Sequence, residues 1–359
     1  MKNITHCITT IERGGAENQL YILVKEQLKV GMKVSIIYLK GEPELKDKLA
    51  SVGVEVLDIL HNRNLILQIL LLKKFLKNKR TILHAHLPRA ELVSSFARGD
   101  NTFIISRHNA EKFFPKSPNF ISQFLSLFVS RRIDACIAIS DAVKNYILSK
   151  KEISNPNKIS VVNYAYNDDF VFQYDLVKKN KGYVIGTIGR LVPQKDHKTL
   201  LIAFSKFLRI YPDSKLMLIG YGVLKNFLAR VSKELGIDDN VIWIDKTYDS
   251  YSLLYQMDLF VLPSSYEGFG LVLLEAMQTN VPIIAANNSA IPEVLGIDYV
   301  GLFETGNSDD LLKKMSLFSN TSLKLNLPAI YENNLMKFEP KLMQEKMLYI
   351  YNSHIPNKI

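Results

Sequence analysis

The sequence contains few of the residues and patterns that mark a secreted or membrane-spanning protein. Only two of its 359 residues are cysteines, Cys7 and Cys136, and both lie in apolar runs typical of buried strands. Free cysteine is usually buried, so this pattern favours two thiols in a reducing compartment over a disulfide. The most apolar stretch, residues 65–72, ends at Lys73 and Lys74 and is far shorter than the roughly 20 residues of a spanning helix.

The N-terminus lacks the features of a secretion signal. Residues 2–7 run straight into a strand pattern, without the long apolar core and small-residue cleavage site of a signal peptide. Hydrophobic residues make up 47% of the chain and charged residues 22%, a balance that is ordinary for a folded globular protein and argues against disorder. We therefore expect a folded cytoplasmic protein, and its length favours two domains over one.

Motifs for two common ligands, dinucleotides and metal ions, are missing as well. Gly14-Gly15 does not form Gly-x-Gly-x-x-Gly after the first expected strand, and no acidic residue is placed to bind a ribose, which argues against a dinucleotide oxidoreductase. No group of His, Cys or acidic residues has zinc-ligand spacing, and no Asp-x-Asp follows a strand to hold a metal-bound diphosphate. We therefore expect no metal site.

The net charge of +10 lies entirely in the first half of the chain. Residues 1–180 contain 27 Lys and Arg against 17 Asp and Glu, whereas residues 181–359 contain 18 basic and 18 acidic residues. The excess indicates either a solvated basic surface or an anionic partner, such as a membrane surface, a pyrophosphate-linked acceptor or a nucleic acid. A nucleic-acid-binding protein would place this charge on an aromatic-rich strand face or a recognition helix. The sequence contains neither, so we expect no nucleic acid partner.

Short apolar, β-branched runs alternate with helix-like stretches, and the alternation occurs twice. The expected strands of the first set are residues 33–38, 54–59, 81–85, 102–106, 135–139 and 159–162, and those of the second set are residues 183–188, 215–219, 241–244, 259–262 and 282–285. Continuous apolar strands separated by helices are typical of parallel sheets covered on both faces. The sequence therefore predicts an α/β protein whose ligands bind at the carboxyl ends of the strands.

The two sets of strands define the expected domains. The first domain comprises residues 1–166, and a linker rich in Asp, Lys and Asn follows at residues 167–182. The second domain comprises residues 183–340. Residues 341–359 carry apolar side chains at helical spacing and are expected to form a last helix that can pack back on the first domain.

The segment with the most chemical information is Leu-Pro-Ser-Ser-Tyr-Glu-Gly-Phe-Gly-Leu-Val-Leu-Leu-Glu-Ala-Met, residues 262–277. An expected strand ends at Leu262, a loop with two glycines follows, and a helix begins near Leu271. Glycines let a backbone approach a ligand closely, and free N–H groups at a helix N-terminus attract phosphate oxygens. Glu267 lies on the loop, and Glu275 lies one turn into the helix, where it could accept hydrogen bonds from a sugar diol. A surface loop beside an exposed helix would also fit this pattern.

Two further strand ends carry residues suited to a diphosphate. Residues 188–196, Ile-Gly-Arg-Leu-Val-Pro-Gln-Lys-Asp, place Arg190 and Lys195 on a loop, and Gly220 and Gly222 follow the next expected strand. Arginine offers a fork of donors, and lysine offers a mobile positive charge. Such residues on one loop are more often solvated, so it is their combination with the glutamate-containing segment that indicates a diphosphate site.

In order and spacing, these motifs resemble those of the retaining glycosyltransferases of family 4, which have the GT-B fold. The matching elements are Gly-Arg-Leu-x-x-x-Lys from residue 189, Gly-x-Gly from residue 220, and Ser-x-x-Glu-Gly-Phe-Gly-Leu-x-x-Leu-Glu-Ala-Met from residue 264. In the first half, Arg-Gly-Gly-Ala-Glu at 13–17, His-Ala-His at 84–86, Arg-His-Asn at 107–109 and Ile-Ser-Asp-Ala-Val at 139–143 also match. The resemblance covers almost the whole chain and implies two facing Rossmann-like domains with parallel sheets and an inter-domain cleft.

The resemblance implies roles for the residues at these strand ends. Arg190 and Lys195 would neutralise the departing nucleotide diphosphate. Glu275 would hold the ribose hydroxyls, and Glu267 would contact the donor sugar and support the positive charge at its anomeric carbon. The remaining residues of the implied donor site are Gly15, Gly220, Gly268, Phe269, Gly270 and Leu271.

We expect different roles for the histidines. His108 would touch the donor sugar or its phosphate and is counted as catalytic with Glu267, Arg190 and Lys195. The expected acceptor-binding residues are His86 and Asn109, whereas His84 and His197 are expected to be structural. In this family the leaving diphosphate takes the acceptor's proton, so no protein base is required. Neither a metal nor a cofactor is expected, because the nucleotide sugar is itself a substrate.

Three positions depart from the family pattern. Residues 163–167, Asn-Tyr-Ala-Tyr-Asn, stand where Asn-Gly-(Ile/Val)-Asp is common, and Ser289-Ala290 stands where Gly-Gly is common. Asp245-Lys246 replaces a glycine near the expected base pocket. These changes affect the identity of the donor more than the class of enzyme.

The expected function is transfer of a sugar from a nucleotide diphosphate sugar to a lipid- or glycan-linked acceptor in surface polysaccharide or lipopolysaccharide biosynthesis. UDP is the expected nucleotide because it is frequent in the family. The same fold also serves nucleotide-sugar epimerases, which would form an epimerised donor. A nucleic-acid-binding protein is the less favoured alternative.

Two stretches in the first half mix basic with apolar residues and suit a helix at an anionic membrane surface, residues 65–80 and 112–132. A helix from Asn119 would put Phe120, Phe124, Leu127 and Phe128 on one face, and an ordinary core-facing helix fits this pattern equally well. If these stretches bind an anionic membrane, the enzyme is expected to be a peripheral protein on the inner face of the cytoplasmic membrane.

Overall fold

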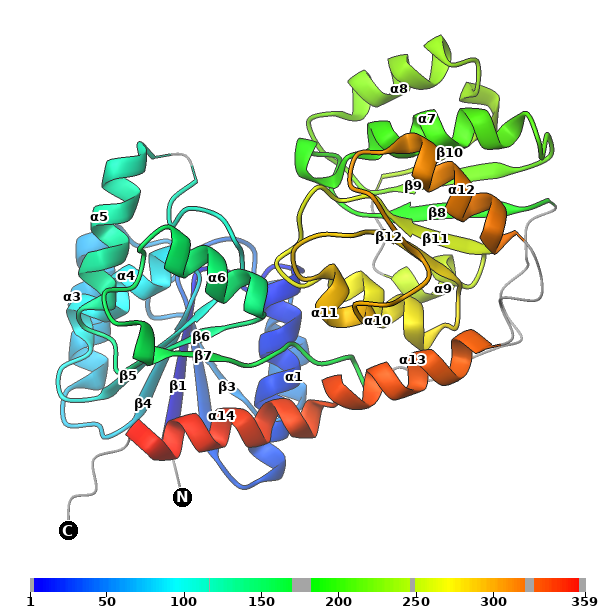
Figure 1. The fold of residues 1–359 in the computed structure, drawn as a ribbon. Coiled ribbons are helices and arrows are strands. Elements are labelled where there is room, and N and C mark those ends of the chain that lie inside the picture. Colours follow the sequence, from blue (N-terminus) through cyan, green and yellow to red (C-terminus); the bar gives the residue numbers. More distant parts are fainter. Residues whose placement is uncertain (1–2, 116, 170–181, 246–248, 320–325, 355–359) are drawn as a thin grey trace. The chain divides into compact units, whose positions relative to one another are not determined.

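A computed structural model of the chain describes residues 3–115, 117–169, 182–245, 249–319 and 326–354, which form two α/β units (Figure 1). Unit 1 comprises residues 1–165 and 338–359, and unit 2 comprises residues 166–337. Most of the expected linker, residues 170–181, lies outside the described part of the chain.

Unit 1 is built on a seven-stranded parallel sheet with the strand order β3-β2-β1-β4-β5-β6-β7. Its strands are β1 (Asn3–Ile8), β2 (Lys33–Tyr38), β3 (Glu55–Leu57), β4 (Ile82–His86), β5 (Thr102–Arg107), β6 (Ala135–Ala138) and β7 (Ile159–Val161). Its helices are α1 (Gly15–Lys29), α2 (Lys46–Ser51), α3 (Leu65–Leu76), α4 (Pro88–Ala97), α5 (Asn119–Ser130), α6 (Asp141–Ser149) and α14 (Pro340–His354). The strand order reverses between β1 and β4, the point at which sheets of this kind bind ligands.

Unit 2 is built on a six-stranded parallel sheet with the strand order β10-β9-β8-β11-β12-β13. Its strands are β8 (Val184–Ile188), β9 (Lys215–Ile219), β10 (Val241–Ile244), β11 (Leu259–Leu262), β12 (Ile283–Ala286) and β13 (Leu302–Phe303). Its helices are α7 (His197–Leu208), α8 (Lys225–Glu234), α9 (Ser250–Leu254), α10 (Leu271–Gln278), α11 (Ile291–Leu295), α12 (Ser308–Phe318) and α13 (Leu327–Leu335). The predicted fold class, two Rossmann-like parallel sheets, is confirmed.

The central strands are buried along their length, as their continuous apolar runs predict. Cys7 in β1 and Cys136 in β6 are free, buried thiols. Burial raises the pKa of each thiol to about 12, so both stay protonated at neutral pH and serve as core residues.

Helix α14 belongs to unit 1 and packs against α1. Its apolar side chains Met343, Met347, Ile350 and Tyr351 are buried in the same core cluster as residues of α1 and β1. The hydroxyl of Tyr351 also takes part in a polar network in the interior of the unit, described below. The last helix therefore completes the core of the unit with which the chain begins.

Helix α5 exposes two of its phenylalanines and buries small polar residues. Phe120 and Phe124 are 72% and 67% exposed, whereas Ser122 and Ser126 are buried. The Ser122 hydroxyl accepts a hydrogen bond from the backbone N–H of Phe114 over 2.9 Å, and the Ser126 hydroxyl donates to the carbonyl of Glu152 over 3.0 Å. The alternative of a helix that packs its phenylalanines into the core is therefore wrong. Within the described residues, no helix is both long and apolar enough to cross a bilayer.

Candidate functional site

The candidate donor residues of unit 2 lie on loops at the carboxyl ends of four adjacent strands, β9, β8, β11 and β12. Hydrogen bonds hold these loops together. The Gly189 N–H donates to the carbonyl of Ile219 over 2.9 Å, and the Ser265 N–H donates to the carbonyl of Gln194 over 2.8 Å. The Asn288 amide donates to the carbonyl of Ser264 over 3.0 Å. Parallel pairing thus gathers segments up to a hundred residues apart at one edge of the sheet.

Glu267 is the most constrained side chain of this edge. The whole residue is only 6% exposed, and its Oε1 accepts hydrogen bonds from the Lys195 ammonium over 2.5 Å and from the Ser264 hydroxyl over 2.6 Å. Its backbone N–H donates to the Ser289 hydroxyl over 2.8 Å. The structure therefore brings together two predicted residues, Glu267 and Lys195, as an ion pair, and adds two serines for which no site role was predicted.

Ser289 occupies a position where the family pattern has glycine. Its φ is +47°, in the left-handed region that favours glycine, and its hydroxyl donates to Oδ1 of Asn288 over 2.7 Å. The serine thus adopts a backbone conformation that glycine adopts readily, and its hydroxyl accepts a hydrogen bond from the loop that carries Glu267. The departure from Gly-Gly noted in the sequence is compatible with the same loop geometry.

Gly220 has a structural reason to be glycine. Its φ is +145°, and a Cβ there would lie 1.9 Å from the carbonyl oxygen of Gly189. The glycine allows the loops after β8 and β9 to contact each other, and its expected contact with the donor remains a prediction. Arg190, on the first of these loops, is exposed, and its side chain has no ion-pair partner among the described residues. Its five donors are available to an anion.

The N-terminus of α10 follows Gly268 and Phe269 directly. Gly270 has a φ of +89° and, as a glycine, offers no side chain to cap the helix that begins at Leu271. The first N–H groups of a helix lack intrahelical acceptors and carry partial positive charge, so they attract anions. The sequence predicted this arrangement of loop and helix, and the structure places it on the same edge as Lys195.

Glu275 lies in the second turn of α10, where it faces α9. Burial raises the pKa of this carboxyl to about 7, although a hydrogen bond with Ser250 acts in the opposite direction. The carboxyl is therefore a mixture of neutral and ionised forms near neutral pH. Ser250 begins α9 and could not be found by sequence reasoning, because nothing in its surroundings resembles a motif.

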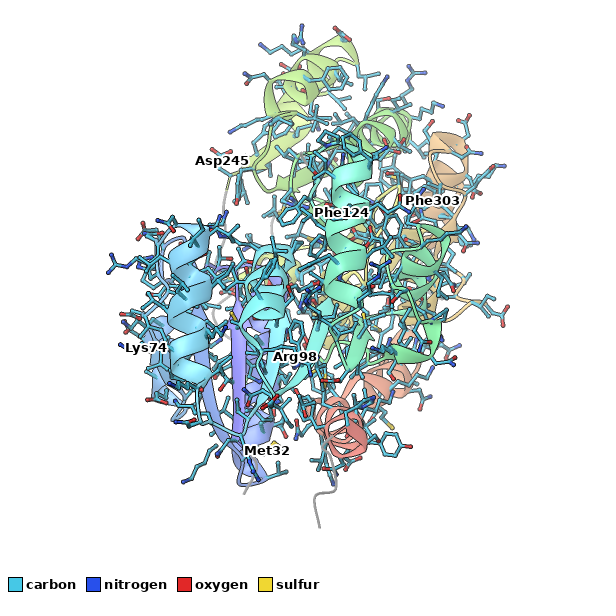
Figure 2. All side chains as sticks on the ribbon, turned by 90° about the vertical axis from the view of Figure 1, so that its left-hand side faces the viewer. Met32, Lys74, Arg98, Phe124, Asp245 and Phe303 are labelled. Carbon is cyan, nitrogen blue, oxygen red and sulfur yellow. The ribbon has the colours of Figure 1, made fainter. Side chains whose placement is uncertain are left out.

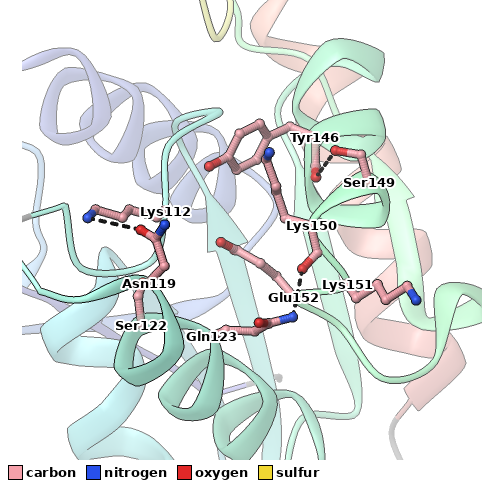
Figure 3. A pocket seen from close by; sticks show the side chains of 9 residues that line it. All are labelled: Lys112, Asn119, Ser122, Gln123, Tyr146, Ser149, Lys150, Lys151 and Glu152. Atoms are coloured by element: carbon pink, nitrogen blue, oxygen red, sulfur yellow. Dashed lines mark hydrogen bonds between the residues drawn. The ribbon is translucent and has the colours of Figure 1, made fainter.

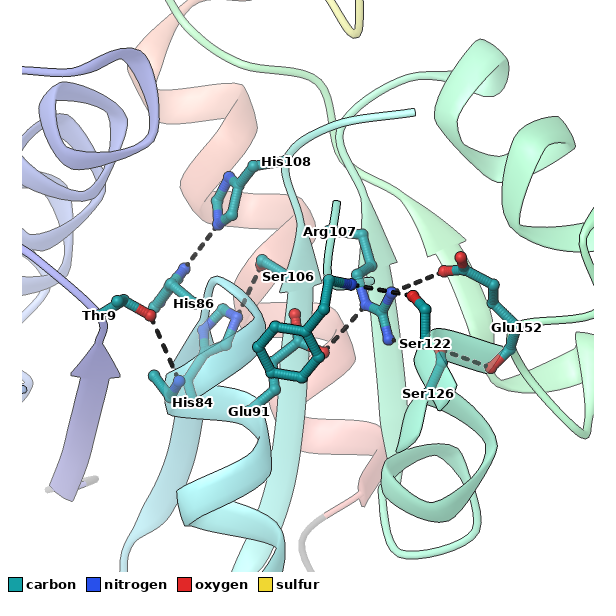
Figure 4. A network of polar contacts seen from close by, with 12 residues as sticks. Thr9, His84, His86, Glu91, Ser106, Arg107, His108, Ser122, Ser126 and Glu152 are labelled. Carbon is teal, nitrogen blue, oxygen red and sulfur yellow. Dashed lines mark hydrogen bonds and ion pairs between the residues drawn. The ribbon is translucent and has the colours of Figure 1, made fainter. Parts of the chain in front are cut away.

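In unit 1, the candidate residues lie at the ends of β4 and β5 and at the start of α1. Gly15 is the first residue of α1, and Asn109 is exposed just after β5. His108 precedes it, and its ring is hydrogen-bonded on both sides. One partner is His86 over 3.1 Å (Figure 4), and the other is the hydroxyl of Tyr164 over 2.5 Å. Tyr164 lies in the segment that departs from the family's Asn-Gly pattern. This tyrosine supplies a hydrogen-bond partner to His108.

The expectation that His86 binds the acceptor is wrong for this structure. The side chain is 2% exposed, and both ring nitrogens are already engaged, one with His6 over 3.0 Å and one with His108. His86 lies beneath His108 and contacts it. His84 is fully buried between Tyr351 and Ser106, and His197 is the buried first residue of α7, positions that fit the structural role expected of both.

Three histidines of unit 1 form a group that the sequence spacing did not reveal. One ring nitrogen each of His6, His84 and His86 lies within 4.8 Å of the others, close enough for a metal ion. Every ring nitrogen of the three, however, has a hydrogen-bond partner at 2.8–3.0 Å or, in one case, 3.1 Å. The group therefore fits a hydrogen-bonded network better than a metal site. His6 was missed because a single histidine in a strand looks like any core residue.

A second buried cluster lies beside this network. The Arg107 guanidinium pairs with Glu91 over 2.9 Å and with Glu152 over 2.8 Å, and all three side chains are buried (Figure 4). Burial and the neighbouring Glu152 raise the pKa of Glu91 to about 7, against the opposing effect of Arg107. The cluster fixes β5 against α4 and the segment after α6, and thus holds the residue that precedes His108.

A cavity of about 480 Å³ lies between α5 and the end of α6 (Figure 3). Its lining includes Lys112, Lys150 and Lys151, but their ammonium groups do not converge. Lys112 donates to the carbonyl of Ser117 over 2.7 Å, Lys150 extends toward the ring of Tyr146, and Lys151 points away. The cavity therefore does not form a cation-lined anion site.

Comparisons with known proteins match both units. Residues 13–170 match the family model described as Glycosyltransferase Family 4, and residues 171–334 match the model described as Glycosyl transferases group 1. The two consecutive matches meet where unit 1 gives way to unit 2. The edge that carries Glu267, Lys195 and α10 lies within the second of them.

Three curated proteins illustrate the similarity. The capsular polysaccharide biosynthesis glycosyltransferase CapM of Staphylococcus aureus is 25% identical over 303 residues, which cover 78% of this chain and 79% of that protein. The N-acetylgalactosamine-N,N'-diacetylbacillosaminyl-diphospho-undecaprenol 4-alpha-N-acetylgalactosaminyltransferase of Campylobacter jejuni is 28% identical over 49% of this chain and 46% of its own length. The UDP-Gal:alpha-D-GlcNAc-diphosphoundecaprenol alpha-1,3-galactosyltransferase of Escherichia coli is 27% identical, with 60% of each protein covered.

Solved structures share the fold over nearly the whole chain. A glycosyltransferase from Rickettsia africae has a TM-score of 0.80 at 21% identity and covers 99% of this chain and 100% of that one. Anabaena HepE, crystallised in complex with UDP-glucose, has a TM-score of 0.81 at 18% identity and covers 98% of this chain and 100% of that one. At these identities the likeness shows a common fold.

Proposed function

We propose that this chain, whose two units match glycosyltransferase family models, transfers a sugar, with retention of anomeric configuration, from a UDP-linked donor to a lipid-linked acceptor in surface polysaccharide biosynthesis. The observation that carries the proposal is the Lys195–Glu267 pair on the loops beside the N-terminus of α10. A fixed carboxylate, a cation and the N–H groups of a helix N-terminus at one sheet edge suit a nucleotide diphosphate sugar.

The proposed mechanism assigns the diphosphate to the cationic groups of this edge. Arg190 and Lys195, with the first N–H groups of α10, bind the diphosphate and stabilise the charge that accumulates on it as the glycosidic bond breaks. Glu267 faces the sugar, where its carboxylate stabilises positive charge at the anomeric carbon. The acceptor hydroxyl attacks from the side that the diphosphate leaves, and the departing diphosphate oxygen takes its proton.

Glu275 is proposed to bind the ribose. Its carboxyl lies one to two turns from the helix end that would hold the diphosphate, a separation suited to the neighbouring ribose. With a pKa near 7, the carboxyl has a neutral and an ionised form at physiological pH. The ionised form is the stronger acceptor for two ribose hydroxyls.

The UDP and lipid-linked assignments draw support from the relatives. Two of the similar proteins are named for diphosphoundecaprenol-linked acceptors, one of these is named for UDP-galactose, and a neighbour of the same fold was crystallised with UDP-glucose. The basic excess of residues 1–180 suits an acceptor that carries a diphosphate. We propose that unit 1 binds this acceptor, with Asn109 among the contacting residues.

An anionic membrane surface is the proposed partner of the face formed by α3, α4 and α5. Helix α4 lies between the other two, and the three run side by side (Figure 2). Ile66 and Leu70 on α3 are 71% and 58% exposed, and Phe120 and Phe124 on α5 are more than two-thirds exposed. Each pair is spaced four residues apart and so points the same way.

Basic side chains flank these apolar residues. Lys73, Lys74, Lys77, Lys79 and Arg80 are exposed at the C-terminal end of α3, and the Arg132 guanidinium lies 3.7 Å from the ring centre of Phe128. Apolar residues that enter the lipid boundary, with Lys and Arg at the headgroups, are typical of peripheral membrane proteins. Lys116, another candidate of this region, lies outside the described residues. We therefore propose reversible binding to the cytoplasmic side of the membrane.

Donor binding by a panel of nucleotide sugars tests the proposal. UDP-, GDP- and ADP-linked sugars are compared by thermal shift and saturation-transfer NMR, with wild-type protein and with Arg190→Ala. A stabilising shift with UDP sugars that is reduced in the variant supports the assignment. Equal shifts with all three nucleotides, or shifts unaffected by the variant, would contradict it.

A further inference from the structure

A continuous line of hydrogen bonds runs through the interior of unit 1 and ends at His108. Oε1 of Gln27, on α1, lies 2.9 Å from Nε2 of His6, on β1, and Nδ1 of His6 lies 3.0 Å from Nε2 of His86, on β4. Nδ1 of His86 lies 3.1 Å from Nε2 of His108, and Nδ1 of His108 lies 2.5 Å from the hydroxyl of Tyr164. Figure 4 shows the step from His86 to His108.

The three rings of this line are neutral at physiological pH. Burial lowers the pKa of His6 to about 4 and that of His108 to about 3, and it lowers the pKa of His86 well below its ordinary value. A neutral imidazole has one N–H donor and one acceptor nitrogen. Each ring must therefore donate at one end and accept at the other, so the tautomer of one ring dictates that of the next.

Gln27 gives this line its direction. Its Nε2 donates to the Tyr351 hydroxyl over 3.2 Å, which leaves Oε1, a pure acceptor, facing His6. His6 must then carry its proton on Nε2 and accept on Nδ1 from Nε2–H of His86. His86 in turn accepts on Nδ1 from Nε2–H of His108. The outer nitrogen of His108, Nδ1, is left as an acceptor, which receives the Tyr164 hydroxyl.

We propose that Gln27 and His6 are positioning residues that, through His86, hold His108 in the Nε2–H tautomer with Nδ1 as an acceptor. An acceptor nitrogen suits a hydroxyl, from Tyr164 or from a sugar, and does not suit a phosphate oxygen. The preference of His108 for a sugar hydroxyl over a phosphate oxygen rests on the proposed function, whereas the tautomer of His108 does not. The two ends of the line are Gln27, buried on α1, and His108, at the end of β5.

Nitrogen NMR of the full chain with 15N-labelled histidine tests the tautomers directly. Long-range 1H–15N spectra at pH 7 distinguish protonated from unprotonated ring nitrogens for each assigned histidine. In the wild type, His6, His86 and His108 are each expected as a single Nε2–H tautomer. Any wild-type spectrum with Nδ1–H at His108, or with averaged nitrogens, would overturn the proposal.

Gln27→Glu provides the sharpest variant. A buried carboxylate beside a neutral ring is unfavourable, so the Glu–His6 pair is expected to hold one additional proton at pH 7. If that proton resides on His6, His6 donates from both ring nitrogens. The direction of the line then reverses, and His86 and His108 both change to the Nδ1–H tautomer. A doubly protonated His6 in this variant together with an unchanged Nε2–H tautomer at His108 would overturn the proposal.

Gln27→Leu and a matched control complete the design. Gln27→Leu removes the acceptor that sets the direction, so His108 is expected to lose its single tautomer, and turnover falls by at least about tenfold, since a wrong histidine tautomer is costly in catalysis. Gln344→Leu changes another buried glutamine of unit 1, whose amide lies 3.8 Å from the sulfur of Met32, and should leave all three tautomers unchanged. If Gln344→Leu alters His108 as much as Gln27→Leu does, the effect is general loosening and the proposal fails.

Discussion

The ammonium of Lys195 and the carboxylate of Glu267 contact each other over 2.5 Å, although they lie on loops that follow different strands. The side chain of Glu267 is 8% exposed and that of Lys195 is 16% exposed. Removing one member of such a pair leaves the other poorly solvated, so the two residues are coupled in stability as well as in catalysis.

This coupling predicts the outcome of a double-mutant cycle. Lys195→Ala is expected to lower turnover by at least ~100-fold, because a charge partner of the leaving diphosphate is lost. It should also destabilise the protein by about 1–3 kcal/mol, because Glu267 keeps its burial but loses a charged donor. The stability loss of the double variant Lys195→Ala/Glu267→Ala should be smaller than the sum of the single losses, as measured by chemical unfolding.

Arg190→Ala is the control for this cycle. Because Arg190 is exposed, Arg190→Ala is expected to lower turnover by a similar factor without changing the free energy of unfolding. Additive stability losses for Lys195 and Glu267, together with normal turnover in Arg190→Ala, would show that this edge is not the donor site.

The pKa of Glu275, near 7, predicts a pH dependence of both stability and binding. Because burial raises this pKa above its unfolded value, the folded protein holds the proton more tightly than the unfolded chain. The stability contribution is present below the unfolded pKa and declines as the pH rises through about 7. Glu275→Gln should therefore gain stability relative to the wild type above pH 7, as measured by thermal unfolding across pH 5–9.

Nucleotide affinity should change in the opposite sense. The ionised carboxylate is the stronger acceptor for the ribose, so affinity for UDP should rise with pH through about 7 in the wild type. UDP affinity is measured by titration calorimetry across this pH range in the wild type and in Glu275→Gln. The ionisation of UDP affects both proteins, so the difference between their pH profiles reports Glu275. An identical pH profile in the two proteins would exclude Glu275 from the ribose site. Glu267→Ala, in contrast, should lower turnover more than nucleotide affinity.

Activity is expected to persist in excess EDTA. The candidate donor edge of unit 2 offers cationic groups and helix N–H groups to the diphosphate, and these can serve where other enzymes use a divalent cation. Turnover is measured before and after chelation and again after addition of Mn²⁺ or Mg²⁺. Activity that disappears in EDTA and returns with either ion would refute metal independence.

Binding to anionic liposomes should depend on salt and on the face formed by α3, α4 and α5. Each Lys or Arg near an anionic bilayer contributes about 1 kcal/mol, and salt screens this attraction. The protein is expected to sediment with anionic liposomes at low salt and to be released at high salt. Phe120→Ser/Phe124→Ser and charge reversal at Lys73 and Lys74 should each weaken binding, whereas donor hydrolysis should stay nearly unchanged.

A matched control lies elsewhere on the surface. Val223 in unit 2 is 84% exposed and apolar, and Val223→Ser should leave liposome binding unchanged. Equal sedimentation with neutral and anionic liposomes, or none with either, would leave the exposed phenylalanines without a membrane role.

The strand ends could be predicted from the sequence because burial on both faces gives parallel strands an unmistakable apolar pattern. Glu267 and Lys195 follow from that pattern with the family motif, since both stand at fixed distances after a strand. Their direct contact could not be predicted, because sequence spacing places a residue on a loop and does not say where its side chain points. The hydrogen bonds that Ser264 and Ser289 make with Glu267 could not be predicted for the same reason.

Helix α5 and the histidine line show where pattern reasoning fails. The spacing of Phe120 and Phe124 predicts a common face but not whether that face is buried, and the serines proved to be the core side because they can hydrogen-bond to neighbouring backbone. The contact between His6 and His86 depends on the register of β1 against β4, which aligns Ile8 with His86. No local signal in the sequence gives that register.

The most direct test of the central claim is the anomeric configuration of the product. UDP-α-linked sugars are incubated with a diphosphoundecaprenol-linked acceptor, and UDP release and the anomeric coupling of the new linkage are followed by NMR. The account predicts stoichiometric UDP release and an α-linked product with wild-type protein, and neither with Lys195→Ala/Glu267→Ala. A β-linked product, an epimerised donor, or turnover that survives the double substitution would contradict it.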